Sequence, residues 1–488
     1  MESAAENTVT FESIVSTVDS WVWGWVLIVL ILAVGVYLSI RTRFVQLRHL
    51  GLALKYMVKN EEDGVGEVSS FGALCTALSA TIGTGNIVGV ATAIVAGGPG
   101  ALLWMLVAAF FGMATKYAEG LLAVKYRTES SPGHFLGGPF YYIEKGLGKK
   151  WRPMAKLFAA FGAVAGLMGI GTMTQVNGIS EAAQNLFDKD KQGLLLELGG
   201  SEKPLLTVTW TTIIVSAAVT FCAALVIIGG IKRIAKVSEV VVPFMAVTYV
   251  LFALIILISN YSEIPAALGL IVRSAFDVSA VGGAISGLLL KTVIQKGIGR
   301  GIFSNEAGLG SAPIAAASAK TKEPVRQGLV TMTGTFIDTI VICTITGLSI
   351  IVTGAWNTGN SIDGAKVTTY AWQHGLPFDK NVSAFILMLC LAFFAFTTIL
   401  GWNYYGERCL EYLTGSRRAI TVYRWLYIGA VFIGSYLALN TVWGIANIFN
   451  GLMAFPNLVA LFLLGGVVSK ETKDFFQRQK RLTRRRTK

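Results

Sequence analysis

The sequence predicts an all-α, polytopic membrane protein with about eleven transmembrane helices. Of its 488 residues, 53% are hydrophobic and only 14% are charged, which is too little charge to cover a water-soluble protein of this length. Apolar runs of about 18 residues or more are long enough to cross a bilayer, and such runs recur from residue 21 to residue 469. Glycine clusters that carry polar residues interrupt two of these runs.

The apolar runs give the order of the spans. The stretch 261–278 is different, because Glu263, Arg273 and Asp277 lie among apolar residues there, as in an amphipathic helix on a membrane surface. The expected spans are 21–40, 68–96, 101–124, 154–187, 205–229, 238–259, 279–319, 327–354, 382–406, 421–439 and 442–469. Three of them, 68–96, 154–187 and 279–319, are long or interrupted.

The two glycine clusters predict broken helices. One reads ALSATIGTGNIVGVATAIVAGG over 77–98, and the other reads KGIGRGIFSNEAGLGSAP over 296–313. Both place polar residues at membrane depth beside residues that weaken a helix. Unwound backbone is tolerated there only where protein or a water-filled cavity satisfies it. The breaks open the first and sixth of the ten spans after 21–40, a pattern typical of inverted-repeat transporters.

Two other interpretations of the glycines were weighed. Glycines in membrane spans often serve only close helix packing, but two clusters at matched positions, each with buried polar groups, weaken that interpretation. Gly83, Gly85 and Gly89 also spell part of a nucleotide-binding motif. No strand precedes them and no acidic ribose ligand follows, so we exclude nucleotide binding.

Basic residues predict the orientation of the chain. With the N-terminus outside, the inside segments hold thirty lysines and arginines and the outside segments hold six, as the positive-inside rule expects. The net charge of +13 is therefore mostly a topology signal, and no nucleic-acid partner is expected. The predicted cell-membrane protein has its C-terminus in the cytoplasm. Its parts are an N-terminal region (1–67), a first five-helix repeat (68–259), a surface helix with a second repeat (260–469) and a basic tail (470–488).

Composition also bounds the chemistry. The five cysteines fall in or beside apolar runs and form no C-x-x-C pair, so we expect small buried residues rather than disulfides or metal ligands. The three histidines all lie in expected loops. No organic cofactor is expected, and the chain is not expected to be an enzyme.

The residues around the two breaks resemble a known family. TIGTGNIVGVATAIVAGGPGALLWM (81–105), FSNEAGLGSAPIAAA (303–317) and FTTILGWNYYGER (396–408) resemble the alanine or glycine:cation symporter (AGCS) family, the sodium/alanine (glycine) symporters. The resemblance runs from about residue 20 to residue 465. It implies a leucine-transporter-like fold with ten core helices in a five-plus-five inverted repeat and two discontinuous helices.

The resemblance also implies a substrate site between the two breaks. Backbone N–H groups and polar side chains at the first break would bind the substrate carboxylate, and backbone carbonyls at the second would receive the ammonium. The residues concerned are Thr84, Gly85 and Asn86 at the first break and Phe303, Ser304 and Asn305 at the second.

Two further side chains are candidates for this site. Gln175 is a buried amide on the fourth span that could hydrogen-bond either group of the substrate, although a packing role is equally compatible. Trp402 lies one helical turn after Thr398 and, with Phe303, would fill the space that a larger side chain needs. The alternative for Trp402 is an interfacial belt position.

For the coupling cation, the resemblance points to hydroxyl and carbonyl oxygens. Thr397 and Thr398 on the ninth span would face Ser79 and Ile82, whose carbonyls are freed by the first break. These oxygens would suit sodium. The alternative is that each threonine bonds a carbonyl of its own helix.

Charged residues inside the spans are expected to be functional or paired. Glu306 could balance a cation, pair with Arg300 or cap the second half-helix, and Asp338 could touch an ion or proton path. Lys116 and Glu119, three residues apart, are expected to pair with each other. Lys291 and Lys296 receive no assignment.

The resemblance implies a secondary active transporter that imports alanine, glycine or both with sodium by alternating access. Its partners would be a small amino acid, sodium and the lipid bilayer. Three alternatives stay open: a proton-coupled amino-acid symporter, a passive pore or facilitator, and an amino-acid sensor.

Overall fold

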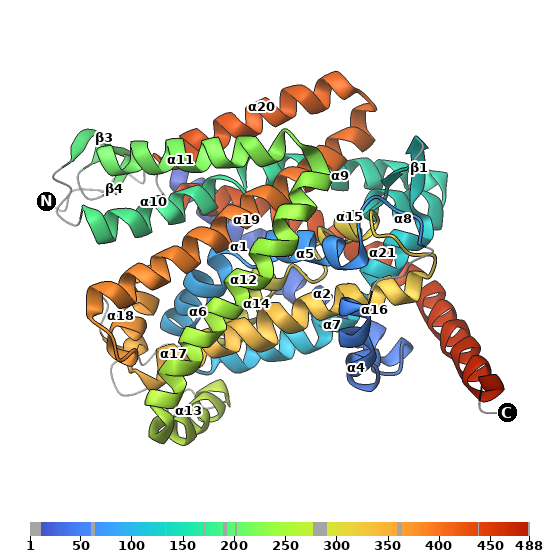
Figure 1. Ribbon diagram of the computed structural model, residues 1–488, viewed down its shortest axis with the longest axis horizontal. Helices are drawn as coiled ribbons and strands as arrows, with labels where there is room; N and C mark the ends of the chain where they lie inside the picture. The colour runs from blue at the N-terminus through green and yellow to red at the C-terminus, as the bar shows by residue number, and fades with distance from the viewer. Residues whose placement is uncertain are drawn as a thin grey trace, which may run out of the picture.

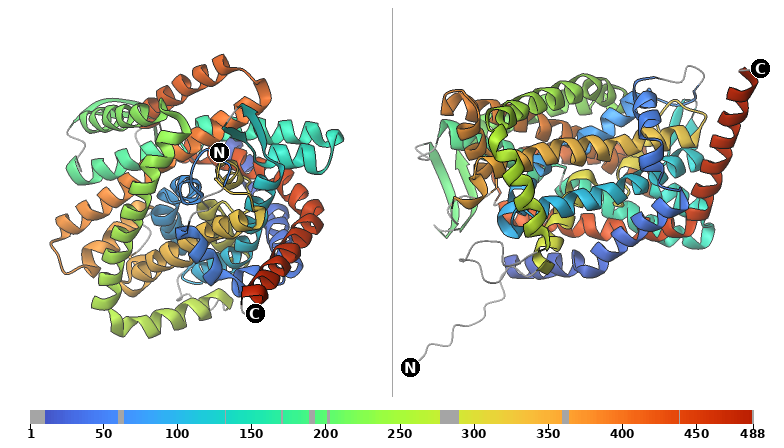
Figure 2. Two further views of the ribbon diagram at one scale, coloured as in Figure 1. Left: turned by 45° about the vertical axis from the view of Figure 1, so that its right-hand side comes forward. Right: turned by 90° about the horizontal axis from the view of Figure 1, so that it is seen from below.

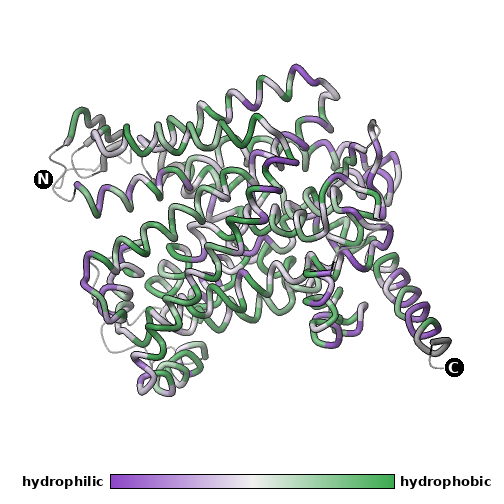
Figure 3. Tube along the Cα trace, viewed as in Figure 1, coloured by the Kyte–Doolittle hydropathy of each residue, from purple (hydrophilic) through white to green (hydrophobic). Residues whose placement is uncertain are grey.

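The protein is a bundle of long helices, most of which run roughly along one axis (Figure 1). The computed structural model describes residues 11–59, 64–131, 133–169, 171–188, 193–200, 203–276, 290–358, 364–437 and 439–486. We call the end with β3, β4, α13 and α18 the α18 end, and the end with β1, α4 and α8 the α8 end (Figure 1). Apolar residues predominate along the helices between the two ends (Figure 3).

The first half of the chain begins with α1 and α2, which form one candidate span that is absent from the ten-helix core of the expected repeat. Its elements are α1 (Phe11–Val22), α2 (Trp25–Arg41), α3 (Val45–Arg48), α4 (Leu50–Val58), α5 (Ser70–Thr81), the π-helix η1 (Gly85–Gly89), α6 (Val90–Gly97), α7 (Ala101–Tyr126), β1 (Thr128–Ser131), β2 (His134–Leu136), α8 (Pro139–Gly146), the short η2 (Lys149–Trp151), α9 (Arg152–Met168), α10 (Met173–Phe187), β3 (Leu194–Gly200), β4 (Lys203–Thr209), α11 (Trp210–Ile227) and α12 (Gly230–Ser259).

The second half opens with the expected surface helix, which is η3 followed by α13. Its elements are η3 (Tyr261–Glu263), α13 (Ile264–Phe276), α14 (Leu290–Asn305), α15 (Ala312–Ala316), α16 (Pro324–Thr335), the π-helix η5 (Phe336–Cys343), α17 (Thr344–Val352), η6 (Ala355–Asn357), α18 (Ala365–Gly375), α19 (Lys380–Thr414), α20 (Arg417–Gly434) and α21 (Leu439–Arg486).

All three spans expected to be long or interrupted are interrupted. The first consists of α5 and the η1–α6 segment, which bend by 54° at the break. The second is divided between α9 and α10. The third is divided between α14 and α15, and its first part, 279–289, lies outside the described residues.

The count of eleven spans is not reached within the described residues. Eight of their helices are long and apolar enough to cross a membrane, or nine if the bent α5–α6 pair is one span. One expected span that does not qualify is 279–319, of which only the later part is described. The other is 421–439, where α20 carries three arginines in 18 residues: Arg417, Arg418 and Arg424.

Two of the connections between helices contain β-strands, so the protein is not entirely α-helical as the sequence predicted. Strands β1 and β2 form an antiparallel pair after α7, and β3 and β4 form another before α11. The expected span 205–229 therefore begins only at Trp210, where Thr209 caps the helix in a capping box with Thr212. Residues 203–209 include β-branched and leucine side chains, which suit a strand as well as a span.

Three helices are longer than the expected spans. The helix α12 includes 230–236, α19 continues from 406 to Thr414, and α21 extends through the expected basic tail to Arg486. This last part of α21 projects from the bundle (Figure 2).

The packing of α19 determines where the first break lies. This helix contacts α5, α9, α10 and α12. A Cβ atom on Gly401 would come within 2.7 Å of the Ala80 Cβ and 2.8 Å of its backbone nitrogen, so the absence of a side chain lets α19 approach the last turn of α5. The interior of the bundle thus holds α19 directly beside the first break.

Candidate functional site

The first break exposes backbone groups between α5 and η1. The helix α5 ends at Thr81, and Ile82 takes an extended backbone conformation. The Gly83 N–H then donates to the Asn86 Oδ1 at 2.9 Å, and the Thr84 N–H donates to the Gln175 Oε1 at 3.2 Å. The side chain of Gln175, on α10, therefore reaches the break that the sequence assigned to the substrate carboxylate.

The side chain of Thr84 is unusual at this break. Its Oγ1 is buried and makes no hydrogen bond within the described part of the chain. A buried hydroxyl without a partner costs about 1–3 kcal/mol, so this atom is suited to a ligand that supplies the missing bond. A Cβ on Gly178 of α10 would lie 2.9 Å from the Thr84 Cγ2, which shows how closely α10 covers the break.

The second break lies beside the first. A Cβ on Gly85 would stand 3.5 Å from both the Phe303 Cδ1 and the Ser304 Cα. Phe303, Ser304 and Asn305 form the last turn of α14 and are all buried. The structure thus brings Gly85, Phe303 and Ser304 together, as expected from the sequence.

The backbone of the second break takes left-handed conformations. Glu306 has φ +56°, and Gly308 and Gly310 have φ +90° and +82°. The N–H groups of both glycines donate to the Glu119 Oε1 at 3.2 Å, and the Asn457 Nδ2 donates to the same oxygen at 2.7 Å. Glu119 thus holds this loop, and Lys116 is near enough to interact with it electrostatically, although no direct ion pair joins the two among the described residues.

Glu306 accepts hydrogen bonds from two side chains around the second break. The Trp402 Nε1 donates to its Oε1 at 2.9 Å, and the Ser311 hydroxyl, at the start of α15, donates to its Oε2. Trp402 is fully buried, and a Cβ on Gly171 would overlap its side chain, 1.9 Å from the Cβ. Trp402 therefore packs between the α9–α10 break and the second break, and it is not an interfacial belt residue.

Asp338 on η5 connects the two breaks. The Asn86 Nδ2 donates to its Oδ1 at 2.7 Å, and the hydroxyls of Ser304 and Thr339 donate to its Oδ2 at 2.9 and 2.7 Å. Asn305 joins the same region, because its Nδ2 donates to the Thr339 Oγ1 at 3.0 Å. Asp338 has no evident partner in the sequence alone, since these contacts join residues as far as 252 positions apart.

The expected cation ligands divide into two groups. The Thr398 Oγ1 lies 3.3 Å from the Ile82 carbonyl oxygen and 3.0 Å from the Phe394 carbonyl oxygen. The Thr398 hydroxyl therefore lies between two carbonyl oxygens beside the first break, and its contact with Phe394 is the own-helix bond that was expected as the alternative to a cation site.

The hydroxyls of the other two expected ligands also bond carbonyls of their own helices. The Thr397 hydroxyl donates to the Phe394 carbonyl at 3.0 Å and approaches the Met245 sulfur at 3.5 Å. The Ser79 hydroxyl donates to the Thr76 carbonyl at 2.8 Å. The described contacts do not bring these two hydroxyls to the Ile82 carbonyl.

Buried charge near the two breaks is predominantly negative. Lys116, on α7, is buried and is near enough to Glu119, Glu306 and Asp338 to interact electrostatically with each carboxylate. Three buried carboxyl groups thus share one buried ammonium. This balance favours a bound cation in their vicinity.

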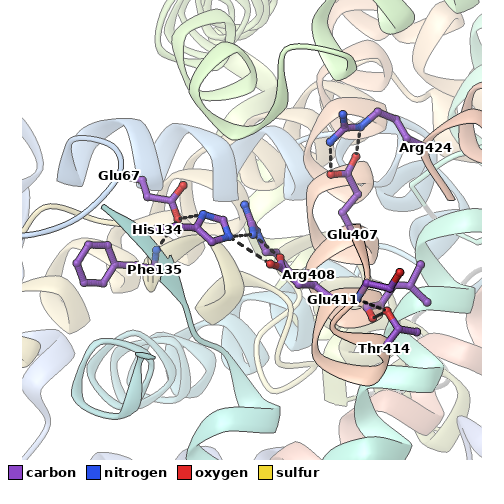
Figure 4. A network of polar contacts seen from close by, with 10 residues as sticks. Glu67, His134, Phe135, Glu407, Arg408, Glu411, Thr414 and Arg424 are labelled. Carbon is purple, nitrogen blue, oxygen red and sulfur yellow. Dashed lines mark hydrogen bonds and ion pairs between the residues drawn. The ribbon is translucent and has the colours of Figure 1, made fainter. Parts of the chain in front are cut away.

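A second polar network lies at the α8 end, away from the two breaks (Figure 4). The two ring nitrogens of His134 lie 3.3 Å from a Glu67 carboxylate oxygen and 3.2 Å from a Glu411 oxygen. Arg408 pairs with Glu411 at 2.5 Å. Hydrogen bonds to Glu411 and Glu67 raise the pKa of His134 to about 9. The network joins the segment before α5, strand β2 and α19.

Arg127 reinforces the same end. Its guanidinium donates at 2.7–2.9 Å to four carbonyl oxygens, those of Val65, Ala317, Ala319 and Thr321. Residues 65–68 run beside 318–321 through backbone hydrogen bonds. The segment before α5 is thereby attached to the segment after α15.

Comparison with known proteins adds three findings. The profile of the sodium:alanine symporter family matches residues 8–488. An uncharacterized transporter of Haemophilus influenzae is 54% identical over 471 residues, covering 96% of this chain and 97% of the relative. The sodium/alanine symporter AgcS of Methanococcus maripaludis is 47% identical over 471 residues, covering 95% and 97%.

A solved structure supports the fold. The crystal structure of MhsT in complex with L-phenylalanine aligns with a TM-score of 0.56 over 83% of this chain and 98% of that chain, at 14% sequence identity. This likeness confirms the leucine-transporter-like fold. The count of eleven helices and the five-plus-five division remain predictions.

Proposed function

Because this chain belongs to the sodium:alanine symporter family, we propose that it imports alanine, glycine or both together with sodium by alternating access. As a member of this family it is a multi-pass membrane transporter and not an enzyme. One observation carries the proposal: the two helix breaks meet at Gly85, next to a Thr84 hydroxyl that has no partner among the described residues and to the Thr398 hydroxyl, which lies between two carbonyl oxygens.

The substrate lies between the breaks in this proposal. The carboxylate binds at Thr84, Gly85 and Asn86, where η1 begins and its N–H groups favour an anion. The remaining members of the proposed site are Gln175, Phe303, Ser304, Asn305 and Trp402. Phe303 and Trp402 are bulky and buried, and a wall of this kind rejects larger side chains by steric overlap.

The cation binds beside the first break in this proposal. The Ile82 and Phe394 carbonyls and the Thr398 hydroxyl supply neutral oxygens, with Ser79 three residues before Ile82 and Thr397 next to Thr398. The surplus of buried carboxylates around Lys116 adds a favourable field. Sodium suits this oxygen-rich setting, and the buried carboxyl groups are the observation that keeps a proton-coupled symporter as the second candidate.

The basic loops orient the protein with its α18 end outside and its α8 end in the cytoplasm. A zwitterionic substrate adds no net charge, so each sodium ion that enters carries one positive charge. That movement is worth roughly 2.3 kcal/mol per 100 mV, which corresponds to roughly 50-fold accumulation.

Uptake by reconstituted protein tests the proposal. Labelled alanine is offered to proteoliposomes under an inward sodium gradient, with an equal potassium gradient for comparison. We expect accumulation above equilibrium with sodium alone. Thr398→Val removes the converging hydroxyl and Gly85→Leu fills the space between the breaks, so both should abolish accumulation.

A matched substitution controls for the loss of a hydroxyl. Thr421 on α20 donates only to the Arg417 carbonyl of its own helix, so Thr421→Val should retain uptake. Accumulation driven by a proton gradient instead of sodium would establish the second candidate. Equilibration without accumulation under either gradient would reduce the protein to a passive facilitator and contradict the proposal.

A further inference from the structure

A cavity lies beside α14 toward the α18 end, and it borders the second break through Phe303. It has a volume of about 260 Å³ and is formed by α1, α14 and the first turns of α21. Pockets for drug-sized ligands start at roughly 300 Å³, so this cavity suits a smaller molecule. Its lining residues include Asp19, Gln295, Lys296, Arg300, Phe303 and Asn447.

The cavity carries charges of both signs. Lys296 is exposed and makes no hydrogen bond or ion pair within the described part of the chain. Asp19, from α1, interacts electrostatically with both Lys296 and Arg300. Two cationic groups thus face one carboxylate across a space large enough for a small molecule.

Asp19 has hydrogen-bonding capacity to spare. Its Oδ1 is buried and accepts no hydrogen bond from any described residue. A carboxylate oxygen buried without a donor is unfavourable. A donor inside the cavity, such as a primary ammonium, supplies the missing hydrogen bond when the Asp19 carboxyl group rotates toward it. The Lys296 ammonium, which has no hydrogen-bond or ion-pair partner among the described residues, is suited to bind an oxyanion.

The cavity leads toward the two breaks. Lys296, Arg300 and Phe303 are spaced four and three residues apart, so they follow one face of α14. Phe303 lines the cavity and also faces Gly85 at the break. One aromatic ring therefore separates the charged cavity from the proposed substrate site.

We propose that this cavity is an outer binding site for a small zwitterionic amino acid. The substrate carboxylate binds Lys296 and Arg300, and its ammonium binds Asp19, before the molecule passes Phe303. The inference rests on the proposed function, because it assigns the same substrate a binding site that it occupies before the central site. Neither α1 nor its Asp19 belongs to the ten-helix core, so the site uses the additional N-terminal helix.

One other molecule shares this chemistry. A phospholipid with an ethanolamine headgroup also presents a primary ammonium next to an oxyanion. The charged and amide groups that line the cavity favour a soluble amino acid. The two sources are separated in the experiment by the lipid composition of the vesicles.

The test compares the affinity for alanine on the two faces of the membrane. Uptake of labelled alanine is measured against external alanine concentration in vesicles of phosphatidylcholine and phosphatidylglycerol, and efflux is measured against internal concentration. Lys296→Gln and Asp19→Asn should each raise the external KM by about tenfold, as the loss of one charged hydrogen bond predicts. The maximal rate and the internal KM should stay unchanged.

Two variants make the test specific. Lys291→Gln removes a lysine of the same helix that stacks on Trp25 and does not line the cavity, so its external KM should equal that of the wild type. Lys296→Arg keeps the positive charge and should retain most of the affinity. A variant that is merely misfolded would lower the maximal rate and alter both faces.

Other results would overturn the inference. An unchanged external KM in Lys296→Gln, or an equal change on both faces, would show that the cavity is not an outer substrate site. If adding phosphatidylethanolamine raises the wild-type KM and Lys296→Gln removes that effect, the occupant is the lipid. Absence of sodium-driven uptake in the wild type would instead contradict the proposed function.

Discussion

Asp338 is a side chain whose hydrogen bonds reach both helix breaks. Its two oxygens accept hydrogen bonds from Asn86 of the first break and Ser304 of the second, and from the neighbouring Thr339. A carboxylate is suited to this position because it only accepts. An amide in the same place would direct an NH₂ group toward a donor.

We therefore expect Asp338→Asn to impair transport. The substitution should leave one buried donor unpaired, at a cost of about 1–3 kcal/mol, and uptake should fall by at least about tenfold. Initial uptake rates and thermal stability in detergent would be measured together. Asp379→Asn, at the cap of α19 near the bundle surface, is the control. Wild-type uptake by Asp338→Asn would disprove the connecting role.

His134 gives the α8 end a pH dependence. Its pKa is raised from 6.5 to about 9 by hydrogen bonds to Glu411 and Glu67, so the protonated ring is stabilised in the folded protein. This contribution is fully present below about pH 6.5 and is lost as the pH rises through about 9. Thermal stability should accordingly decline between these values. In His134→Gln the decline should be smaller, and an identical profile would contradict the prediction.

At the scale of elements, the second break depends on left-handed glycines. Gly310 has φ +82°, and its Cβ would stand 2.8 Å from both Phe158 and Pro139 side-chain atoms. Gly415, at the end of α19, has φ +60° with no atom within 4 Å. Gly415→Ala should cost only the conformational strain, about 1–2 kcal/mol. Gly310→Ala should cost clearly more and also reduce uptake. Melting temperatures of the two variants, measured side by side, check this difference, and equal values would contradict it.

The elements also show what a single sequence reveals. Glycine clusters and their neighbouring polar residues predicted the two breaks, because a break leaves a local compositional signature. The strands β3 and β4 were missed, because β3 lies in an expected loop and residues 205–209 of β4 were assigned to the start of a span. Span ends differed for α12 and α21 because hydropathy does not record how far a helix continues beyond the membrane.

Contacts between distant segments explain the remaining differences at the site. The sequence indicated that Thr398 would face Ile82, and the two lie 3.3 Å apart. It could not distinguish Thr398 from Thr397, which differ only in the side of α19 they occupy. The bond between Glu119 and the loop of Gly308 and Gly310 joins α7 to residues about 190 positions away, and nothing local to Glu119 indicated it.

For the whole molecule, a bound cation should stabilise the fold. A ligand at one hundred times its Kd adds about 2.7 kcal/mol, so sodium chloride should raise the melting temperature above that in equimolar potassium chloride. Thr398→Val should lose the difference, and Thr421→Val should keep it. Equal melting temperatures of the wild type in both salts would argue against a specific sodium site.

The four carbonyls bound by Arg127 have a consequence for movement at the α8 end. Because one guanidinium holds them all, the four bonds are not independent, and withdrawing that group frees every carbonyl in the same event. Residue 65 and residues 317–321 therefore have a joined arrangement and a separated one. An intermediate arrangement is unfavourable, because it leaves carbonyl groups without their hydrogen-bond donor. Separation at this end therefore requires Arg127, which directly follows α7, to leave all four carbonyls, together with the loss of the backbone hydrogen bonds between residues 65–68 and 318–321.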